Sequence, residues 1–267
     1  MKFSLTPVIR AVAAQFGYSY ERIPTDKRPA PDMTTFTKFV ANTIRSQNDG
    51  VVSTGPFRGM KMSSSTPWSS HDQASRLLGC YEQELHPAIE QAISRNPDLV
   101  INIGSGDGYY ATGLALRVPM ANVIAFDTLV PAQIATKAIA KLNKVDGRVE
   151  ARGHCDPEAL AKLVSRSQRA LIFSDCEGYE EKLFSADTIN AYRDSSLIIE
   201  CHDFQDSRVT KKLTDLFSAT HHVLNIVEGA RNPNEFSCLE NQSSLFRWVA
   251  VCEFRPALMH WLSVTPK

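Results

Sequence analysis

Short apolar runs alternate with amphipathic helical patterns between residues 75 and 205, and this alternation restricts the possible folds more than any other feature of the chain. Runs of four to six mostly apolar residues are typical of strands that are buried on both faces. Strands that alternate with helices predict a parallel sheet with helices on both sides. The expected strands are 99–104, 122–128, 149–155, 170–176 and 196–204.

The two ends of the chain follow other patterns. Residues 223–229 and 244–254 are apolar, and a long polar stretch without an evident helix joins them, which predicts a closing antiparallel hairpin. Near the N-terminus we expect a helix at 33–47 and short strands within 51–62. Residues 1–75 contain too little apolar material for a core of their own, so we expect a cap or lid on a main domain at 76–267.

The predicted fold is therefore an α/β, Rossmann-like, doubly wound sheet. It has seven mostly parallel strands, a C-terminal antiparallel hairpin, and an N-terminal cap of helices and loops.

Composition narrows the choice of partner. The chain has 267 residues with 29 basic and 29 acidic side chains, and no run of like charge, so neither nucleic acid nor an anionic membrane is an expected partner. The six scattered cysteines form no CxxC pair, which favours reduced thiols in a cytoplasmic protein. No apolar run in the sequence is long enough to span a bilayer.

Three glycines separated by single residues follow the first expected strand, in the stretch DLVINIGSGDGYY at 98–110. In open α/β sheets a ligand binds beyond such a turn, where glycines allow the backbone to approach it closely. A dinucleotide fingerprint, GxGxxG, would need glycine where Tyr109 stands. The GxGxG spacing instead suits a ligand without a pyrophosphate, such as the amino-acid part of S-adenosylmethionine.

Asp127 ends the second expected strand, about twenty residues farther on, where a carboxylate can accept hydrogen bonds from both ribose hydroxyls. Taken singly, a glycine turn can be structural and such an aspartate can cap a helix. Found together and in this order, the two features favour a cofactor site.

The chain resembles the class I S-adenosylmethionine-dependent methyltransferases, and within them the FkbM-like branch. The resemblance covers roughly residues 75–255 and rests on INIGSGDGYYATGLAL, VIAFD, SDCEGYEEKLF and LIIECHDF. Its most specific part is a D-x-E-G-x-E element made by Asp175, Glu177, Gly178 and Glu180.

By this resemblance, the glycine loop should line the methionine part of the cofactor, Asp127 the ribose, and the HCDPE turn the adenine. Asn102 replaces the acidic residue that usually holds the cofactor's ammonium group, although an amide oxygen can still accept a hydrogen bond. Asp156 precedes Pro157, so it can equally be a helix cap. The expected cofactor residues are Asn102, Gly104, Ser105, Gly106, Asp107, Asp127, Thr128, Cys155, Asp156 and Asp175.

An alcohol acceptor is a poor nucleophile and needs either a base or a metal ion. Candidate side chains follow the fourth and fifth strands, and we predict His202 as the base, with Asp175 and Glu200 positioning the acceptor. Magnesium-dependent sugar O-methyltransferases have an aspartate pair after the fifth strand, and His202 stands in the first of those places. We therefore expect no metal ion, with a divalent cation on Asp175 and Asp203 as the rival.

The expected activity is O-methylation of a small-molecule or sugar hydroxyl, by analogy with FkbM-like relatives. An NAD-dependent oxidoreductase and a non-catalytic cofactor-binding protein remain alternatives, and the oligomeric state stays open. Tyr81, Glu82 and Glu84 begin the helical segment 79–97, where they can face either the ligands or solvent.

Overall fold

The computed structural model describes residues 32–64 and 71–267. The chain divides into two units, Met1–Phe36 and Thr37–Lys267. Predictions that fall on 1–31 and 65–70, which make up about half of the expected N-terminal cap, lie outside the described residues.

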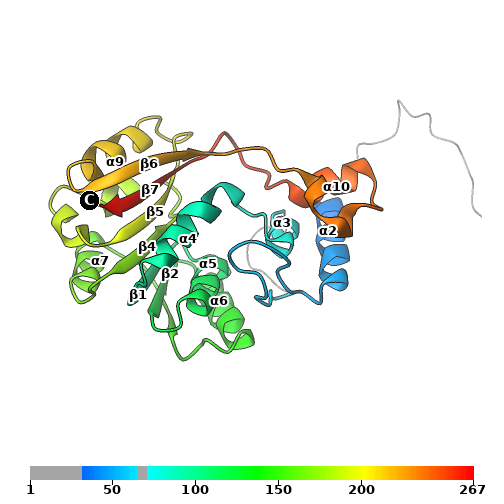
Figure 1. Cartoon of the computed structure of the whole chain (residues 1–267), viewed down its shortest axis with the longest axis horizontal. Helices are drawn as coiled ribbons and strands as arrows, with labels where there is room; N and C mark the ends of the chain where they lie inside the picture. Colours follow the sequence, from blue (N-terminus) through cyan, green and yellow to red (C-terminus); the bar gives the residue numbers. More distant parts are fainter. Residues whose placement is uncertain (1–31, 65–70) are drawn as a thin grey trace, which may run out of the picture. The chain divides into compact units, whose positions relative to one another are not determined.

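A seven-stranded sheet in the order β3-β2-β1-β4-β5-β7-β6 forms the centre of the second unit (Figure 1). The strands β1 to β5 are parallel to one another, whereas β7 runs antiparallel to both β5 and β6. This topology confirms the predicted fold class. The strands are β1 Leu99–Ile103, β2 Asn122–Phe126, β3 Val149–Arg152, β4 Ala170–Ser174, β5 Ser196–Cys201, β6 His221–Val227 and β7 His260–Pro266.

The second half of the C-terminal hairpin was predicted in the wrong place. Ser244–Val251 is the helix α10, which begins where Ser243 caps the amide of Phe246, and the final strand is His260–Pro266. In α10 the buried residues Phe246, Val249 and Ala250 recur at helical spacing while Trp248 is exposed, so the apolar run follows a period of 3.6 rather than 2.

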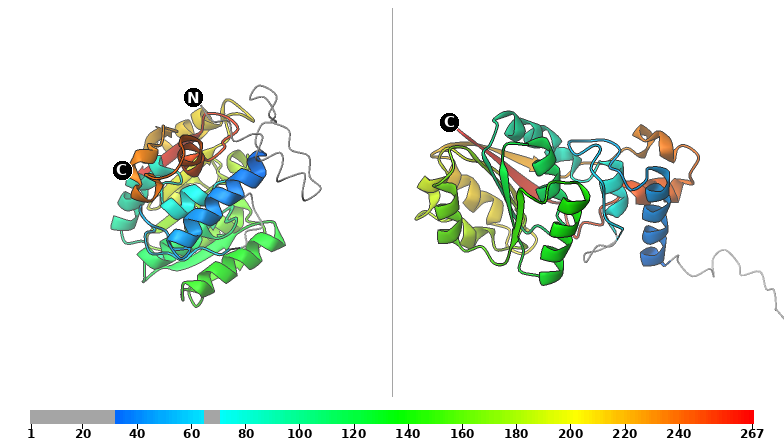
Figure 2. Two further views of the ribbon diagram at one scale, coloured as in Figure 1. Left: turned by 90° about the vertical axis from the view of Figure 1, so that its right-hand side faces the viewer. Right: turned by 90° about the horizontal axis from the view of Figure 1, so that it is seen from below.

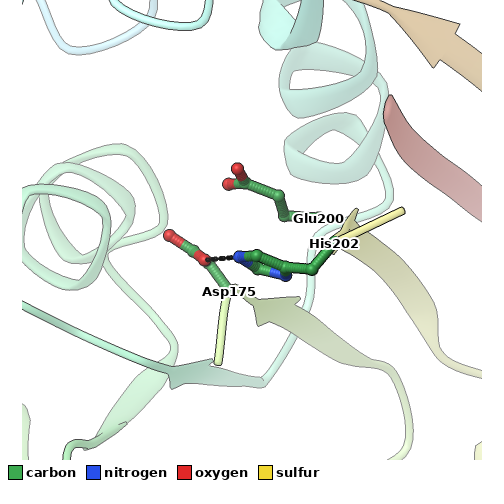
Figure 3. Close-up of side chains that lie close together, drawn as sticks. All are labelled: Asp175, Glu200 and His202. Carbon is green, nitrogen blue, oxygen red and sulfur yellow. Dashed lines mark ion pairs between the residues drawn. The ribbon is translucent and has the colours of Figure 1, made fainter. Parts of the chain in front are cut away.

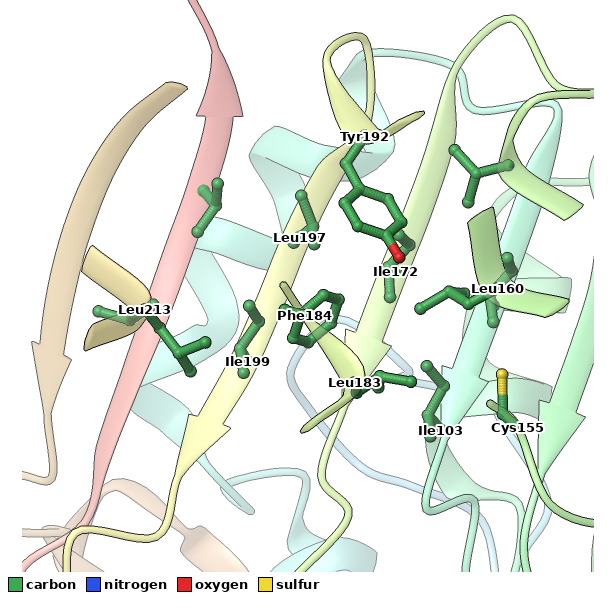
Figure 4. Packing of buried hydrophobic residues seen from close by; sticks show 14 of the residues in the cluster. Ile103, Cys155, Leu160, Ile172, Leu183, Phe184, Tyr192, Leu197, Ile199 and Leu213 are labelled. Atoms are coloured by element: carbon green, nitrogen blue, oxygen red, sulfur yellow. The ribbon is translucent and has the colours of Figure 1, made fainter. Parts of the chain in front are cut away.

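Helices cover both faces of the sheet (Figure 2). On one face, Leu160, Leu183 and Leu213 from α7, α8 and α9 pack with strand residues such as Ile172 and Ile199 in a continuous buried core (Figure 4). The helices α4, α5 and α6 contact strands β1, β2, β3 and β5. The helical elements are α2 Met33–Gln47, α3 Gln73–Leu78, η2 Gln83–Leu85, α4 His86–Ser94, α5 Tyr109–Arg117, α6 Val130–Leu142, α7 Pro157–Val164, α8 Glu180–Leu183, η3 Ile189–Tyr192, α9 Val209–Phe217, η4 Pro233–Glu235 and η5 Ser237–Leu239.

Residues 37–64 belong to the same compact unit as the sheet. The helix predicted at 33–47 is present as α2. The predicted short strands are reduced to a single bridge between Val51 and Lys61. Phe57 explains the attachment, because its ring lies against Gly113 of α5 and meets the ring of Tyr109 edge-on.

All six cysteines lie in the described part and have free thiols. Among the described helices, none combines the length and the hydropathy needed to cross a membrane.

We predict that Phe57→Ala lowers the free energy of unfolding by about 3–5 kcal/mol, because the ring fills a closed space between residues 37–64 and α5. Urea denaturation measures the change. Met120→Ala, at a residue that is 88% exposed, is the control and should stay within about 0.5 kcal/mol of the parent. Equal stability of the two variants would contradict the packing of this segment on the sheet.

Candidate functional site

A cavity of about 660 Å³ opens at the carboxyl ends of the parallel strands. Its walls include residues 104–107, 127–129, 153–155 and 175–177, which follow β1, β2, β3 and β4. Glu200 of β5 and His202, which follows that strand, complete this side. The volume lies within the range of small-molecule and cofactor sites, and the position is the one at which open α/β sheets bind ligands.

The glycine loop is tied to the strands on either side of β1. The backbone amides of Gly104 and Ser105 both donate to the Phe126 carbonyl oxygen at 2.9 Å. Gly104 has φ +74°, and a Cβ there would lie 1.5 Å from the Asp175 carbonyl oxygen, so no other residue fits without moving the end of β4. Gly106 differs, because a Cβ built on it meets no atom within 4 Å.

Asp127 lies beside this loop, as predicted. Its Oδ2 accepts the amide of Gly106 at 2.9 Å and its Oδ1 accepts that of Leu129 at 2.9 Å. Each carboxylate oxygen can accept two hydrogen bonds, so the side chain keeps capacity for a ligand in the cavity that it lines.

Arg76 of α3 holds the loop from the other side, and the sequence analysis did not identify it. Its guanidinium donates to Asp107 Oδ1 at 2.8 Å and pairs with Asp72 at 2.7 Å. It also lies over the ring of Tyr81, 4.4 Å from the centroid. The Asp107 carboxylate is therefore engaged with the protein, although Asp107 itself lines the cavity.

Most of the other expected cofactor residues also line the cavity, but two do not. Asp156 is the N-cap of α7 and accepts the amide of Ala159 at 2.7 Å, which confirms the cap interpretation, and it is not among the residues that line the cavity. Asn102 is 1% exposed on β1 and is not among the residues that line the cavity. The residues found in the cavity wall are Gly104, Ser105, Gly106, Asp107, Asp127, Thr128, Cys155 and Asp175.

The structure brings together the three predicted catalytic residues, Asp175, Glu200 and His202 (Figure 3). One oxygen or nitrogen atom from each lies within 4.8 Å of the others. His202 Nε2 is 3.6 Å from Asp175 Oδ1 and 3.4 Å from Glu177 Oε2. On the other side of the ring, Nδ1 is 3.1 Å from Oε1 of the buried Glu180.

Three carboxylates surround His202 and bear on its predicted role as a base, which stays a prediction. Burial alone would lower the pKa of the imidazole, but Glu177, Glu180 and Asp175 outweigh burial and raise this pKa to about 10. The ring is then protonated at neutral pH and has no lone pair to accept a proton. The residue type alone does not indicate this protonation state, because it depends on three carboxylates that raise the pKa of the histidine above its ordinary value.

The pKa values of Asp175 and Glu200 are raised, whereas an ordinary ion pair lowers the pKa of its carboxyl group. Burial, followed by the negative charge of Glu82, raises the pKa of Asp175 to about 7. Burial and repulsion from Asp175 raise the pKa of Glu200 well above its usual value. Burial and the neighbouring carboxylates therefore outweigh the positive charges of His202 and Arg255 at these two groups.

Arg255 provides the main counter-charge, and it too was missed. Its guanidinium bonds to Glu82, to Glu200 at 2.9 Å and to Glu253 at 3.1 Å. Glu82, which is 1% exposed, also accepts the hydroxyl of Tyr110, so this part of segment 79–97 is not a solvated first turn. No motif or spacing links residue 82 to residue 255, so only the folded chain reveals the network.

Asp203 does not belong to the group, because its carboxylate accepts the amide of Thr210 at 3.0 Å and the Thr210 hydroxyl. It binds the first turn of α9, and it is not among the residues whose ligand atoms meet at Asp175.

No protein-family model matches the chain, and no curated protein matches it either. Solved structures with a partial likeness include an O-methyltransferase from Bacillus cereus in complex with SAH, at 11% identity, 97% coverage of both chains and TM-score 0.45. A putative precorrin-6Y C5,15-methyltransferase domain from Corynebacterium diphtheriae shares 14% identity over 70% of this chain and 98% of its own, with TM-score 0.45. A ribosomal protein L11 methylase from Lactobacillus delbrueckii shares 16% over 69% and 79%, with TM-score 0.41. Such values assign no activity, so the function has to follow from the chain's own residues.

We predict that Gly104→Ala lowers the free energy of unfolding by about 2–4 kcal/mol, because the added methyl group meets the Asp175 carbonyl and the positive φ disfavours alanine. Gly147→Ala is the matched control, since its Cβ meets nothing within 4 Å, and it should change stability by no more than about 0.5 kcal/mol. Thermal or urea unfolding compares the two variants. A Gly104→Ala protein as stable as the control would show that the ends of β1 and β4 do not meet as described.

Proposed function

We propose that the protein is an S-adenosylmethionine-dependent methyltransferase that acts on a hydroxyl group of a small molecule or sugar. The observation that carries this proposal is the meeting of the glycine loop with Asp127: the Gly106 amide bonds to the carboxylate at 2.9 Å, and the space above Gly106 is open.

The residues in the cavity wall suit this cofactor. Gly104 to Gly106 allow the methionine part to approach the backbone closely, and the free lone pairs of Asp127 can accept the ribose hydroxyls. Phe126, Leu129 and Cys155 offer an apolar wall for the adenine ring.

Charge in the cavity favours S-adenosylmethionine over a dinucleotide. The sulfonium and ammonium groups of this cofactor are positive, and Asp175, Glu177 and Glu200 line the same cavity. A dinucleotide would place two negative phosphates among these carboxylates. It would also need a glycine at the position of Tyr109, which is a fully buried aromatic residue in contact with Phe57.

The acceptor would bind at the end of the cavity formed by Asp175, Glu200 and His202. S-adenosylmethionine supplies an activated methyl group, so the protein has to align the acceptor oxygen, exclude water and remove the hydroxyl proton. Carboxylates accept hydrogen bonds from hydroxyl groups, which suits a polyol or a sugar in this position. The protonated ring of His202 can donate to an acceptor oxygen, and the hydroxyl proton would pass to the neighbouring carboxylate of Asp175, whose pKa is raised to about 7 by burial.

The cofactor assignment predicts that S-adenosylmethionine and its demethylated product bind to the purified protein, measured by titration calorimetry. Asp127→Asn should weaken both at least tenfold, because the amide has only one accepting oxygen for the loop and the ribose. Asp156→Asn is the control, since this residue caps α7 outside the cavity and asparagine can also cap. Binding of NAD at comparable strength, or equal affinity of the Asp127→Asn protein, would count against the assignment.

The acceptor assignment predicts transfer of a labelled methyl group to hydroxyl compounds, tested with a panel of sugars, polyols and small alcohols next to matched amines and carboxylic acids. The products should be ethers, which survive mild alkali, whereas methyl esters release methanol. Glu200→Gln should reduce kcat at least 100-fold while leaving the affinity for the cofactor product within about threefold, because Glu200 lies at the acceptor end. Label found only on nitrogen or as ester would reject O-methylation while leaving cofactor use intact.

A further inference from the structure

We propose that Asp175, Glu200 and His202 Nε2 bind a divalent transition-metal ion. The three side chains project from the ends of β4 and β5 toward one point, and their closest ligand atoms lie within 4.8 Å of one another (Figure 3). Ligands of a zinc-like ion each lie about 2 Å from it, so two of them stand up to about 4 Å apart. Side-chain adjustments of less than about 1 Å therefore close the group around an ion.

Glu200 provides an independent sign of a missing partner. Its side chain is 2% exposed, and Arg255 donates to Oε1 at 2.9 Å, but Oε2 has no hydrogen-bond partner. A buried carboxylate oxygen without a donor or a cation is costly. A metal ion next to Asp175 would satisfy this atom.

Glu180 lies beside the other ring nitrogen of His202, in an ion-pair contact that does not have the geometry of a hydrogen bond. Its Oε1 lies 3.1 Å from Nδ1 of the ring, it is fully buried, and it is itself held by the amide of Cys176 at 3.0 Å. A carboxylate on one ring nitrogen fixes the ring and leaves the other nitrogen to the metal. Nε2 is the nitrogen that faces Asp175 and Glu177.

The balance of charge supports a cation in the same place. Asp175, Glu200 and Glu82 lie close together, and of the three only Glu82 and Glu200 bond to the single guanidinium of Arg255. A dication between Asp175 and Glu200 would offset the remaining repulsion. Asp203 is not among the residues whose ligand atoms meet here, and its carboxylate accepts from Thr210.

The ligand types select the kind of ion. Magnesium prefers oxygen ligands in near-octahedral geometry and keeps several waters, whereas an imidazole with two carboxylates suits zinc, manganese or iron. Three protein ligands leave open positions on the side of the cavity. An acceptor hydroxyl would occupy such a position, and only this last role rests on the proposed function.

The test uses the full chain, stripped with a chelator, without cofactor or acceptor. Calorimetry with Zn²⁺ and electron paramagnetic resonance with Mn²⁺ should each show one equivalent bound, with Mg²⁺ at least tenfold weaker. Pulsed resonance on the Mn²⁺-loaded parent protein should show coupling to an imidazole nitrogen, an observation that needs no variant. Circular dichroism checks that each variant is folded.

Variants then separate ligands from neighbours. Glu200→Gln, which keeps the size of the side chain, should weaken metal binding at least 100-fold, and Glu180→Gln, a positioning variant, by about 10- to 100-fold. Asp203→Asn is the matched control and should leave the affinity unchanged, because asparagine can still accept from Thr210.

The outcomes distinguish the metal site from the cofactor assignment. A parent protein that binds S-adenosylmethionine but no Zn²⁺ or Mn²⁺ overturns the metal site alone. Loss of binding in Asp203→Asn with retention in Glu200→Gln also overturns it, in favour of the pair Asp175 and Asp203. Magnesium bound as tightly as zinc rejects the transition-metal assignment. Metal binding without any binding of S-adenosylmethionine supports the metal site and rejects the proposed function.

Discussion

The close approach of the ends of β1 and β4 governs the geometry of the whole site. At this point the backbone of Gly104 passes so near the Asp175 carbonyl that a side chain cannot fit, and the same turn bonds to the last residue of β2. Three strand ends are thereby locked together, which places Asp127 and Asp175 on opposite sides of one glycine loop. The ligand contacts proposed for each aspartate follow from this single packing constraint.

Buried charge is the second determinant of the site. Arg255 joins Glu82, Glu200 and Glu253, and these residues come from widely separated parts of the chain. A buried network of this kind contributes little net stability, because desolvating each charge offsets the attraction between them. Its effect is to hold Glu200 in a fixed orientation at the cavity wall, with one oxygen engaged and one without a partner. Such an arrangement costs stability and is characteristic of sites that bind a ligand.

Local pattern was sufficient to predict the five parallel strands and the glycine turn after the first of them. Buried parallel strands have nearly continuous apolar sequences, and closely spaced glycines indicate a tight turn. The fold class and the region around Gly104 and Asp127 could therefore be predicted from the sequence. The apolar pattern gave a wrong prediction where the same run of apolar residues is compatible with both a strand and a helix. The stretch that includes Ser244–Val251 was assigned to a strand because its apolar residues are nearly continuous, and only packing against one side revealed the helix. For Asp156 the sequence left a cap and a ligand contact open, and its bond to Ala159 confirms the cap.

Roles that depend on charge could not be predicted, because ion pairs between distant residues leave no periodicity in a sequence. Arg255 and Glu82 are 173 positions apart, and nothing in either neighbourhood points to the other. The consequence is largest at His202. An isolated histidine near a carboxylate is a natural candidate for a general base, but Glu177, Glu180 and Asp175 together keep the ring protonated when no cation is present. A dication on Asp175 and Glu200 would disfavour that proton and free Nε2 as a ligand, so the same three carboxylates that keep the ring protonated are the surroundings that a metal-binding histidine needs.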